Sequence, residues 1–388
     1  MAFVPNPPRF VFSERQPNDY GGNSISGIAF RPSPDPANLF FGVSTWGNPG
    51  QPGQVNVCQA QIDPANGRVG AANGIAQKQT PAADPVLSVA WVTTEFLLAS
   101  GCADGTVRVW DPQSQKEEEF KQHQKAVKVV KAFSPETGYI ASGSWDKSVI
   151  IWNIKSKEKL EIKCPERVYA MDVLDQRVLV GTADRHVIIY DIRKHDVPLS
   201  QGFSPLRMQT RCVCFIPAPN DIRFAVADCQ GRLGVTSVAD PGASFVIRVT
   251  ENRMKKPTGE EQKVTFAVNV IAPCPANPGV VATGSCDGRF AFWNVAQKPI
   301  NIPENEMVEP LFSSVSAVGS EFAPPGSFSP VYPTHHTIPA AAWSPRGDTF
   351  AFVDSADGFG GQKDYLSNQP QMVAGVQNAV YFHKVERQ

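Results

Sequence analysis

The chain has 388 residues, of which 42% are hydrophobic and 19% are charged, and its formal net charge is −1. This composition supports a large buried core and excludes wholesale disorder. The near-neutral charge gives no reason to expect a partner that demands a strongly basic protein, such as bulk nucleic acid or an anionic membrane surface.

Neither a cationic-then-apolar leader nor an apolar run long enough to span a bilayer is visible in the sequence, so secretion and a membrane span are not expected. The cysteines are scattered, and no two have Cys-x-x-Cys spacing. We therefore expect free thiols in a reducing compartment. These cysteines are Cys58, Cys102, Cys164, Cys212, Cys214, Cys229, Cys274 and Cys286.

A short phrase recurs along the chain: small residues, an acid, a β-branched stretch and an aromatic residue. It reads SGCADGTVRVWD at 100–111, SGSWDKSVIIWN at 142–153, GTADRHVIIYDI at 181–192 and TGSCDGRFAFWN at 283–294. The acids are Asp104, Asp146, Asp184 and Asp287, and the first three are 42 and 38 residues apart. A spacing near 40 with this phrase is typical of WD40 repeats, each of which forms one four-stranded propeller blade. The sequence therefore predicts an all-β fold, a WD40 β-propeller.

Short β-branched or aromatic runs, bounded by glycine, proline, asparagine or aspartate, extend this pattern over the whole chain. They group into sets of an inner strand, a middle strand and a third strand that carries the aromatic residue. In chain order the seven sets cover 25–62, 86–111, 126–153, 167–192, 210–238, 266–295 and 338–385. We therefore expect residues 1–388 to form a single seven-bladed propeller.

The ring must also close, because an open ring leaves its terminal strands as unpaired edges. The run RFVFSE at 9–14 has no blade of its own, so we expect it to pair as the outer strand of blade seven. Residues 296–337, rich in proline and serine, are expected to be a long excursion between blades six and seven. A further long connection is expected inside blade seven at 355–378, and a charged loop at 251–265.

A histidine before the third set could belong to a catalytic group or to a structural network. His123, Ser142, Asp146 and Trp152 match the hydrogen-bond chain of a WD repeat, in which a buried histidine joins a turn aspartate, a strand hydroxyl and an indole. We favour this structural network over a catalytic triad, because its polar groups satisfy one another internally. No histidine, cysteine or carboxylate group has metal-ligand spacing, and neither a cofactor nor a small-molecule substrate is expected.

Two tryptophans stand where middle strands run into their turns, in VSTWGN and GSWDKS. They are Trp46 and Trp145, and the equivalent positions in blades two and four are Ala103 and Ala183. The repeat does not require tryptophan there, so we expect these side chains to anchor a partner, with local packing as the alternative. Cations near this rim could bind acidic side chains. They are Lys147, Arg167, Arg211, Arg232, Arg253, Lys255, Lys256 and Arg289.

The central third of the chain resembles a known family. The stretches ASGSWDKSVIIWN at 141–153, CPERVYAMDVLDQRVLVGTADRHVIIYDIRK at 164–194 and SPLRMQTRCV at 204–213 are similar to the RAE/GLE-type mRNA export factors of the nuclear pore. They are also similar to the Bub-type propeller of the spindle checkpoint. The chain departs from the family before blade six, where the loop reads VTENRMKK and retains only Arg253 of a longer basic phrase.

The resemblance implies a non-enzymatic adaptor of nuclear mRNA export, found in the nucleus, at the pore complex of the nuclear envelope and in the cytoplasm. It implies that one face binds a GLEBS-type acidic segment of a phenylalanine-glycine nucleoporin, with RNA or ribonucleoprotein as a further candidate partner. The matching positions for peptide binding are Trp46, Trp145, Arg253, Arg211 and Arg289.

Two alternatives stay open at this point. A spindle-assembly-checkpoint adaptor would bind GLEBS-type peptides of kinetochore proteins through the same chemistry. A propeller enzyme would need acids, histidines or metal ligands that converge at the mouth of the central channel, and the sequence places no such group together.

Overall fold

Strands make up nearly all of the regular secondary structure of the described residues. The computed structural model describes residues 10–16, 24–32, 35, 37–47, 52–63, 65, 69–81, 84–92, 96–133, 137–250, 252–255, 261–298, 310–315, 336–356 and 379–385. Within these ranges the only helix is a single 3-10 turn, η1 (Pro241–Ala243). None of the described residues forms a helix that is long and apolar enough to cross a membrane.

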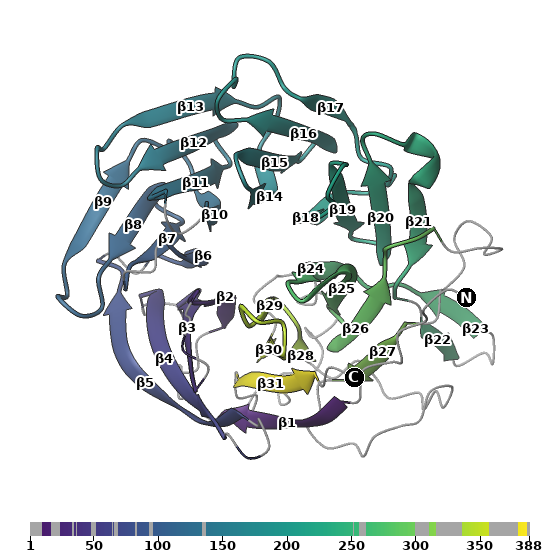
Figure 1. Ribbon diagram of the computed structural model, residues 1–388, viewed down its shortest axis with the longest axis horizontal. Coiled ribbons are helices and arrows are strands. Elements are labelled where there is room, and N and C mark those ends of the chain that lie inside the picture. The colour runs from purple at the N-terminus through teal and green to yellow at the C-terminus, as the bar shows by residue number, and fades with distance from the viewer. Residues whose placement is uncertain are drawn as a thin grey trace.

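The strands form seven antiparallel blades arranged in a ring (Figure 1). Blade one contains β2 (Ile25–Phe30), β3 (Asn38–Thr45), β4 (Gln54–Ile62) and β5 (Val69–Gln79). Blade two contains β6 (Val86–Trp91), β7 (Leu98–Cys102), β8 (Thr106–Trp110) and β9 (Glu117–Lys121). Blade three contains β10 (Val127–Ala132), β11 (Tyr139–Ser144), β12 (Ser148–Asn153) and β13 (Lys159–Lys163).

The second half of the ring repeats this order. Blade four contains β14 (Val168–Leu174), β15 (Arg177–Thr182), β16 (His186–Asp191) and β17 (Ser200–Phe203). Blade five contains β18 (Thr210–Ile216), β19 (Arg223–Asp228), β20 (Arg232–Ser237) and β21 (Phe245–Arg248). Blade six contains β24 (Val268–Cys274), β25 (Asn277–Ser285), β26 (Arg289–Asn294) and β27 (Phe312–Val315).

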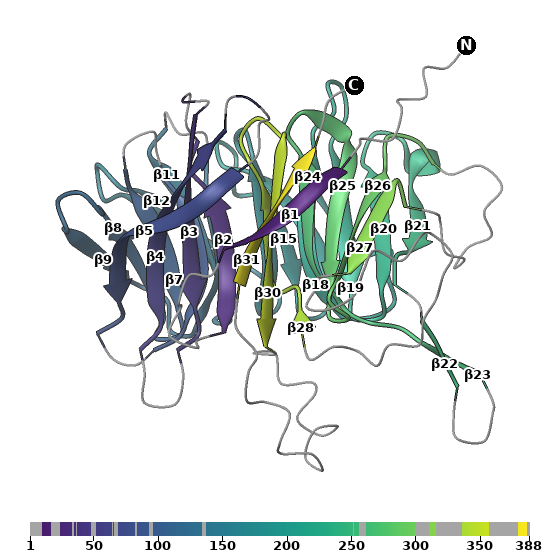
Figure 2. The same ribbon diagram turned by 90° about the horizontal axis from the view of Figure 1, so that it is seen from below.

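Blade seven joins the two ends of the chain. It contains β29 (Ala341–Trp343), β30 (Thr349–Ala356), β31 (Ala379–Val385) and β1 (Phe10–Gln16), and β28 (His336–Thr337) pairs with β30. β1 is antiparallel to β31, with Phe10 opposite Val385 and Gln16 opposite Val380 (Figure 2). The prediction that the N-terminal strand closes the last blade is therefore confirmed.

Apolar contacts between blades hold the ring together. The third strand of blade three, SVIIWN, is buried at every position but the last, as expected for a strand covered on both faces. Its Ile150 and Trp152 join Val127 and Val130 of the inner strand and Val107 of blade two in one buried cluster. At the closure, Phe41 of blade one packs edge-on against Phe382 of blade seven, with ring centroids 5.2 Å apart.

The glycine of the repeated phrase is explained by the close approach of neighbouring blades. A Cβ atom at Gly143 would lie 2.7 Å from Cγ1 of Val168 on the inner strand of the next blade, and one at Gly101 would lie 2.8 Å from Cγ1 of Val127. These distances are shorter than carbon atoms tolerate, so glycine at this position allows the blades to pack.

Three expected loops are corrected by the structure. The charged loop at 251–265 contains a hairpin, β22 (Asn252–Lys255) paired with β23 (Glu261–Val264), which extends beyond the blades in Figure 2. The excursion at 296–337 is not entirely a connection, because β27 completes blade six and β28 joins blade seven. The connection expected at 355–378 begins later, because residues 355 and 356 belong to β30; residues 357–378 lie outside the described ranges.

Candidate protein-binding face

One face of the ring carries the turns between middle and third strands and the loops that lead from blade to blade. Backbone hydrogen bonds join these turns and loops: Trp46 donates to the carbonyl of Ser24 at 2.9 Å, and Trp145 to that of Ala126 at 3.0 Å. Ala183 donates to the carbonyl of Arg167 at 2.9 Å in the same way. Both predicted tryptophans therefore lie on this face, which we call the turn face.

The two tryptophans differ in exposure. Trp145 is 36% exposed although the residues on either side of its turn, Ser144 and Ser148, are buried. Trp46 is only partly exposed, so it contributes less accessible surface than Trp145. An exposed indole in a structured turn is the kind of side chain that supplies buried area when a partner binds.

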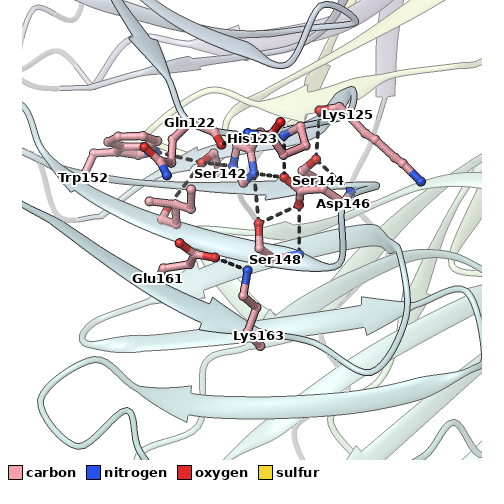
Figure 3. A network of polar contacts seen from close by, with 12 residues as sticks. Gln122, His123, Lys125, Ser142, Ser144, Asp146, Ser148, Trp152, Glu161 and Lys163 are labelled. Carbon is pink, nitrogen blue, oxygen red and sulfur yellow. Dashed lines mark hydrogen bonds and ion pairs between the residues drawn. The ribbon is translucent and has the colours of Figure 1, made fainter.

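A buried network supports the turn that carries Trp145 (Figure 3). Nδ1 of His123 lies 2.9 Å from Oδ2 of Asp146, and Nε2 of the same ring lies 2.8 Å from Oγ of Ser142. The indole N–H of Trp152 donates to the same Oγ atom at 2.8 Å. Ser148 donates to Oδ1 of Asp146 at 2.6 Å. The structure thus brings together all four residues of the predicted network, and adds Ser148 to it.

The protonation states in this network follow from its geometry. Burial lowers the pKa of His123 below its ordinary value, and the opposing effect of Asp146 is smaller. Burial would raise the pKa of Asp146, but hydrogen bonds from Ser148, from the Gln124 N–H and from His123 outweigh it and lower that pKa. The neutral imidazole of His123 carries its proton on Nδ1, because the opposite tautomer would set the lone pair of Nδ1 against a lone pair of the carboxylate. Both ring nitrogens are then engaged: Nδ1 donates to Asp146, and Nε2 accepts from the buried hydroxyl of Ser142.

A second recurring feature lies in the inner strands, which surround the centre of the ring (Figure 1). The pairing of each inner strand from blade one to blade six shifts register after its first residue, and an extra residue stands at each shift. These residues are Ser26, Leu87, Lys128, Tyr169, Arg211 and Asn269. A guanidinium nitrogen of Arg211 donates to Oδ1 of Asn269 at 2.9 Å. Burial, and then the charge of Arg211, lower the pKa of Lys128 to about 8.

Sequence reasoning missed Lys128, because a lysine within VKVVKA reads as the exposed side of a half-buried strand. It stands at the same register shift as the predicted Arg211, whose charge contributes to its lowered pKa. Three residues further along the same strand, Lys131 lies 3.1 Å from Asp172 of the next inner strand.

The remaining predicted arginines are distributed along the turn face. Arg289 begins the third strand of blade six, and its side chain lies 3.8 Å from the buried carboxylate of Asp287. Arg253 lies on β22, opposite Lys263 of β23, in the hairpin between blades five and six. Arg253 and Arg289 therefore stand in neighbouring connections of the ring, whereas Trp46 and Trp145 come from blades one and three.

Among the described residues, no group of three or more histidine, cysteine or acidic side chains is placed to hold a metal ion. Three histidines, His123, His186 and His195, each lie near a single acid. His186 lies 2.8 Å from Asp184 in blade four, and His195 lies 3.5 Å from Asp196.

The blades and the repeated turn define a WD40-repeat β-propeller. The family described as WD domain, G-beta repeat matches residues 77–111 and 114–153. Two solved structures share the fold, "Structure of U3-55K" and "Crystal structure of RRP9 WD40 repeats". Both have a TM-score of 0.65 and 18% identity; the first covers 96% of this chain and 98% of its own, the second 96% and 97%.

Sequence comparison is more specific. The mRNA export factor GLE2 of Chaetomium thermophilum is 30% identical over 276 residues, which cover 70% of this chain and 72% of that protein. The Poly(A)+ RNA export protein of Schizosaccharomyces pombe is 29% identical over 279 residues, with the same two shares. The mitotic checkpoint protein bub-3 of Caenorhabditis elegans is 34% identical over 203 residues, 51% of this chain and 57% of that protein. The chain belongs to the WD40-repeat family of GLE2-type mRNA export factors, with the checkpoint propellers as relatives.

Proposed function

We propose that this protein is a non-enzymatic adaptor in nuclear mRNA export, which docks to a GLEBS-type acidic segment of a phenylalanine-glycine nucleoporin at the nuclear pore. Relatives that cover most of the chain are named as mRNA export factors, which supports the export role. The observation that carries the docking proposal is the exposed indole of Trp145 on the turn face.

The chemistry of the turn face suits an acidic guest. Binding would bury the apolar surfaces of Trp46 and Trp145 away from water. Such buried aromatic side chains are the main source of affinity in protein interfaces. Arg211, Arg253 and Arg289 would bind carboxylates, for which the planar guanidinium is better suited than lysine. The near-zero net charge of the chain implies that any contact with RNA is local or shared with the nucleoporin.

Titration calorimetry with a synthetic GLEBS-type peptide tests the proposal. Trp145→Ala combined with Arg253→Glu should weaken binding about tenfold or more, which corresponds to about 1.4 kcal/mol, and should leave the thermal melt nearly unchanged. Lys155→Glu is the matched charge control, because Lys155 lies exposed in the turn between the third and outer strands of blade three, away from the turn face. Unaltered affinity in the double variant would remove the turn face as the docking site.

The second candidate is a checkpoint adaptor that binds kinetochore proteins, favoured by the 34% identity to bub-3 over the shorter shared region. Affinity capture of the tagged protein separates the two. Recovery of a nucleoporin with staining of the nuclear rim supports the export adaptor. Recovery of a kinetochore protein with mitotic foci, and of no nucleoporin, supports the checkpoint adaptor instead.

A further inference from the structure

Exposed apolar side chains gather on one side of blade four. Six large hydrophobic residues are exposed in the described part of the chain, and four of them fall between positions 197 and 208. They are Val197 at 71%, Leu199 at 48%, Phe203 at 66% and Met208 at 37%. This segment comprises β17, the outer strand of blade four, and the residues on either side of it, which we call the blade-four edge.

The backbone of β17 offers unused hydrogen-bonding groups. β17 pairs with β16 on one side only, with Phe203 opposite His186 and Gln201 opposite Ile188. The N–H of Ser204 donates to the carbonyl of Arg185 at 2.7 Å. Because inward-facing and outward-facing residues alternate along an antiparallel pair, the N–H and C=O groups of Gln201 and Phe203 point away from β16.

This edge lacks the usual protection against pairing with another chain. Outer strands are normally blunted by charged side chains. Of the outer strands whose side chains the structure describes, β17 alone contains no charged residue; the others carry charge in EEEFK, KLEIK, FVIR and at Lys78. The face of the sheet is also open at Gly202, where an added Cβ atom would meet nothing within 4 Å.

Positive charge is held at one end of this strand. Arg185 adopts a left-handed backbone with φ of 70°, at a turn position where blades two, five and six have Gly105, Gly231 and Gly288. This conformation strains the backbone of a non-glycine residue such as Arg185. Its Nη1 donates to the carbonyl of Arg207 at 3.1 Å, and its guanidinium lies 5.9 Å from the ring centre of Phe203.

These cations have no acidic partner within the described residues: no carboxylate pairs there with Arg185 or Arg207. The ring of Phe203 packs on that of His186, with centroids 4.3 Å apart, yet remains 66% exposed. The edge therefore combines a free row of backbone groups, an exposed aromatic ring and two arginines that form no ion pair with the described residues.

We propose that β17 is a docking edge for an extended acidic segment of a partner protein, which adds to blade four as a fifth strand. Backbone hydrogen bonds would supply affinity, and Phe203 and the two arginines would select a segment with apolar and acidic side chains. A second copy of this chain fits less well, because pairing two such edges would bring together surfaces of the same positive charge.

The probe is a short fluorescein-labelled peptide that alternates valine with glutamate or aspartate, with a lysine-for-acid version as its control. Gln201→Pro removes one outward N–H and spares the bonds to β16, as proline does on edge strands. Gln201→Ala is the matched control, because it keeps that N–H. We expect Gln201→Pro to weaken binding about fivefold relative to Gln201→Ala, the equivalent of one hydrogen bond of about 1 kcal/mol.

Arg207→Glu tests the charge independently of the proline, and should also weaken binding of the acidic peptide while leaving the melt unchanged. Bound peptide should slow hydrogen exchange at Gln201 and Phe203. Trp145→Ala should not affect this binding, so the outcome is separate from the nucleoporin proposal. Absence of binding, equal affinity of the proline and alanine variants, or equal binding of the lysine peptide would overturn the inference. So would a uridine-tract RNA that binds this edge when the acidic peptide does not.

Discussion

Nδ1 of His123 lies 2.9 Å from Oδ2 of Asp146, although the two residues are 23 positions apart. The contact links the loop that enters blade three to the turn that leaves its middle strand. Trp145 stands next to Asp146 in that turn, so the network sets the backbone from which the exposed indole projects. Stability of the blade and presentation of the turn face are therefore coupled at this point.

Removing the imidazole should destabilise the protein. His123→Ala would leave the carboxylate of Asp146 and the hydroxyl of Ser142 each without one buried hydrogen-bond partner. The free energy of unfolding should fall by about 2 kcal/mol. Chemical denaturation would show this as a lower midpoint with an unchanged slope. Gln124→Ala, at the exposed neighbouring position, is the control and should change the free energy of unfolding by less than about 0.5 kcal/mol. Equal effects of the two substitutions would contradict the structural role of His123.

The same network predicts a pH dependence. The pKa of His123 is lower in the folded protein than its ordinary value of about 6.5, because burial favours the neutral ring. The folded protein thus binds fewer protons here than the unfolded chain, so this stabilisation is complete above pH 6.5 and is lost as the pH falls below it. Thermal melts between about pH 7.5 and pH 5.5 should show a steeper decline for the wild type than for His123→Asn. The lowered pKa of Asp146 does not interfere, because that carboxylate stays ionised throughout this window. Parallel pH curves for the two proteins would argue against the assignment.

Closure of the ring predicts the effect of a truncation. Deletion of residues 1–15 removes most of β1 and exposes the edge of β31, with which β1 pairs from Phe10 to Gln16. The melting temperature should fall by about 5 °C or more. Deletion of residues 1–8 alone, which stops short of β1, serves as the comparison. If the longer deletion melts no earlier than the shorter one, β1 does not hold the first and last blades together.

How much of the fold could be predicted depended on which strands are buried. Inner, middle and third strands are covered on both faces by the neighbouring blades. Such strands are visible in the sequence as continuous apolar runs, for example SVIIWN. Outer strands face solvent on one side and read as ordinary charged segments, so EEEFK and KLEIK gave no strand signal. The strand FSSV of blade six was missed because it lies inside a proline-rich segment.

Only part of the candidate site could be predicted from the sequence. Trp145 and His123 could be found because each stands out against the repeat: the tryptophan replaces an alanine, and the histidine completes a known hydrogen-bond pattern. Lys128 could not be found, because it stands at a register shift that leaves no mark in residue type. The blade-four edge depends on which side of SQGF is paired, and only the strand order reveals that.

The packing of successive blades yields the last prediction. At Gly143 an added methyl group would lie 2.7 Å from Cγ1 and 3.4 Å from Cβ of Val168, a β-branched side chain that is itself fully buried and cannot move aside. Gly143→Ala should therefore destabilise the protein by about 1–3 kcal/mol, the usual cost of overpacking a core. Gly202→Ala is the matched control, because the same methyl group there would meet nothing within 4 Å and should change stability by less than about 0.5 kcal/mol. Val168→Ala should relieve part of the cost of Gly143→Ala, because the two substitutions concern one contact and their effects should not add. Strict additivity in this double-mutant cycle would mean that blades three and four do not meet at this glycine.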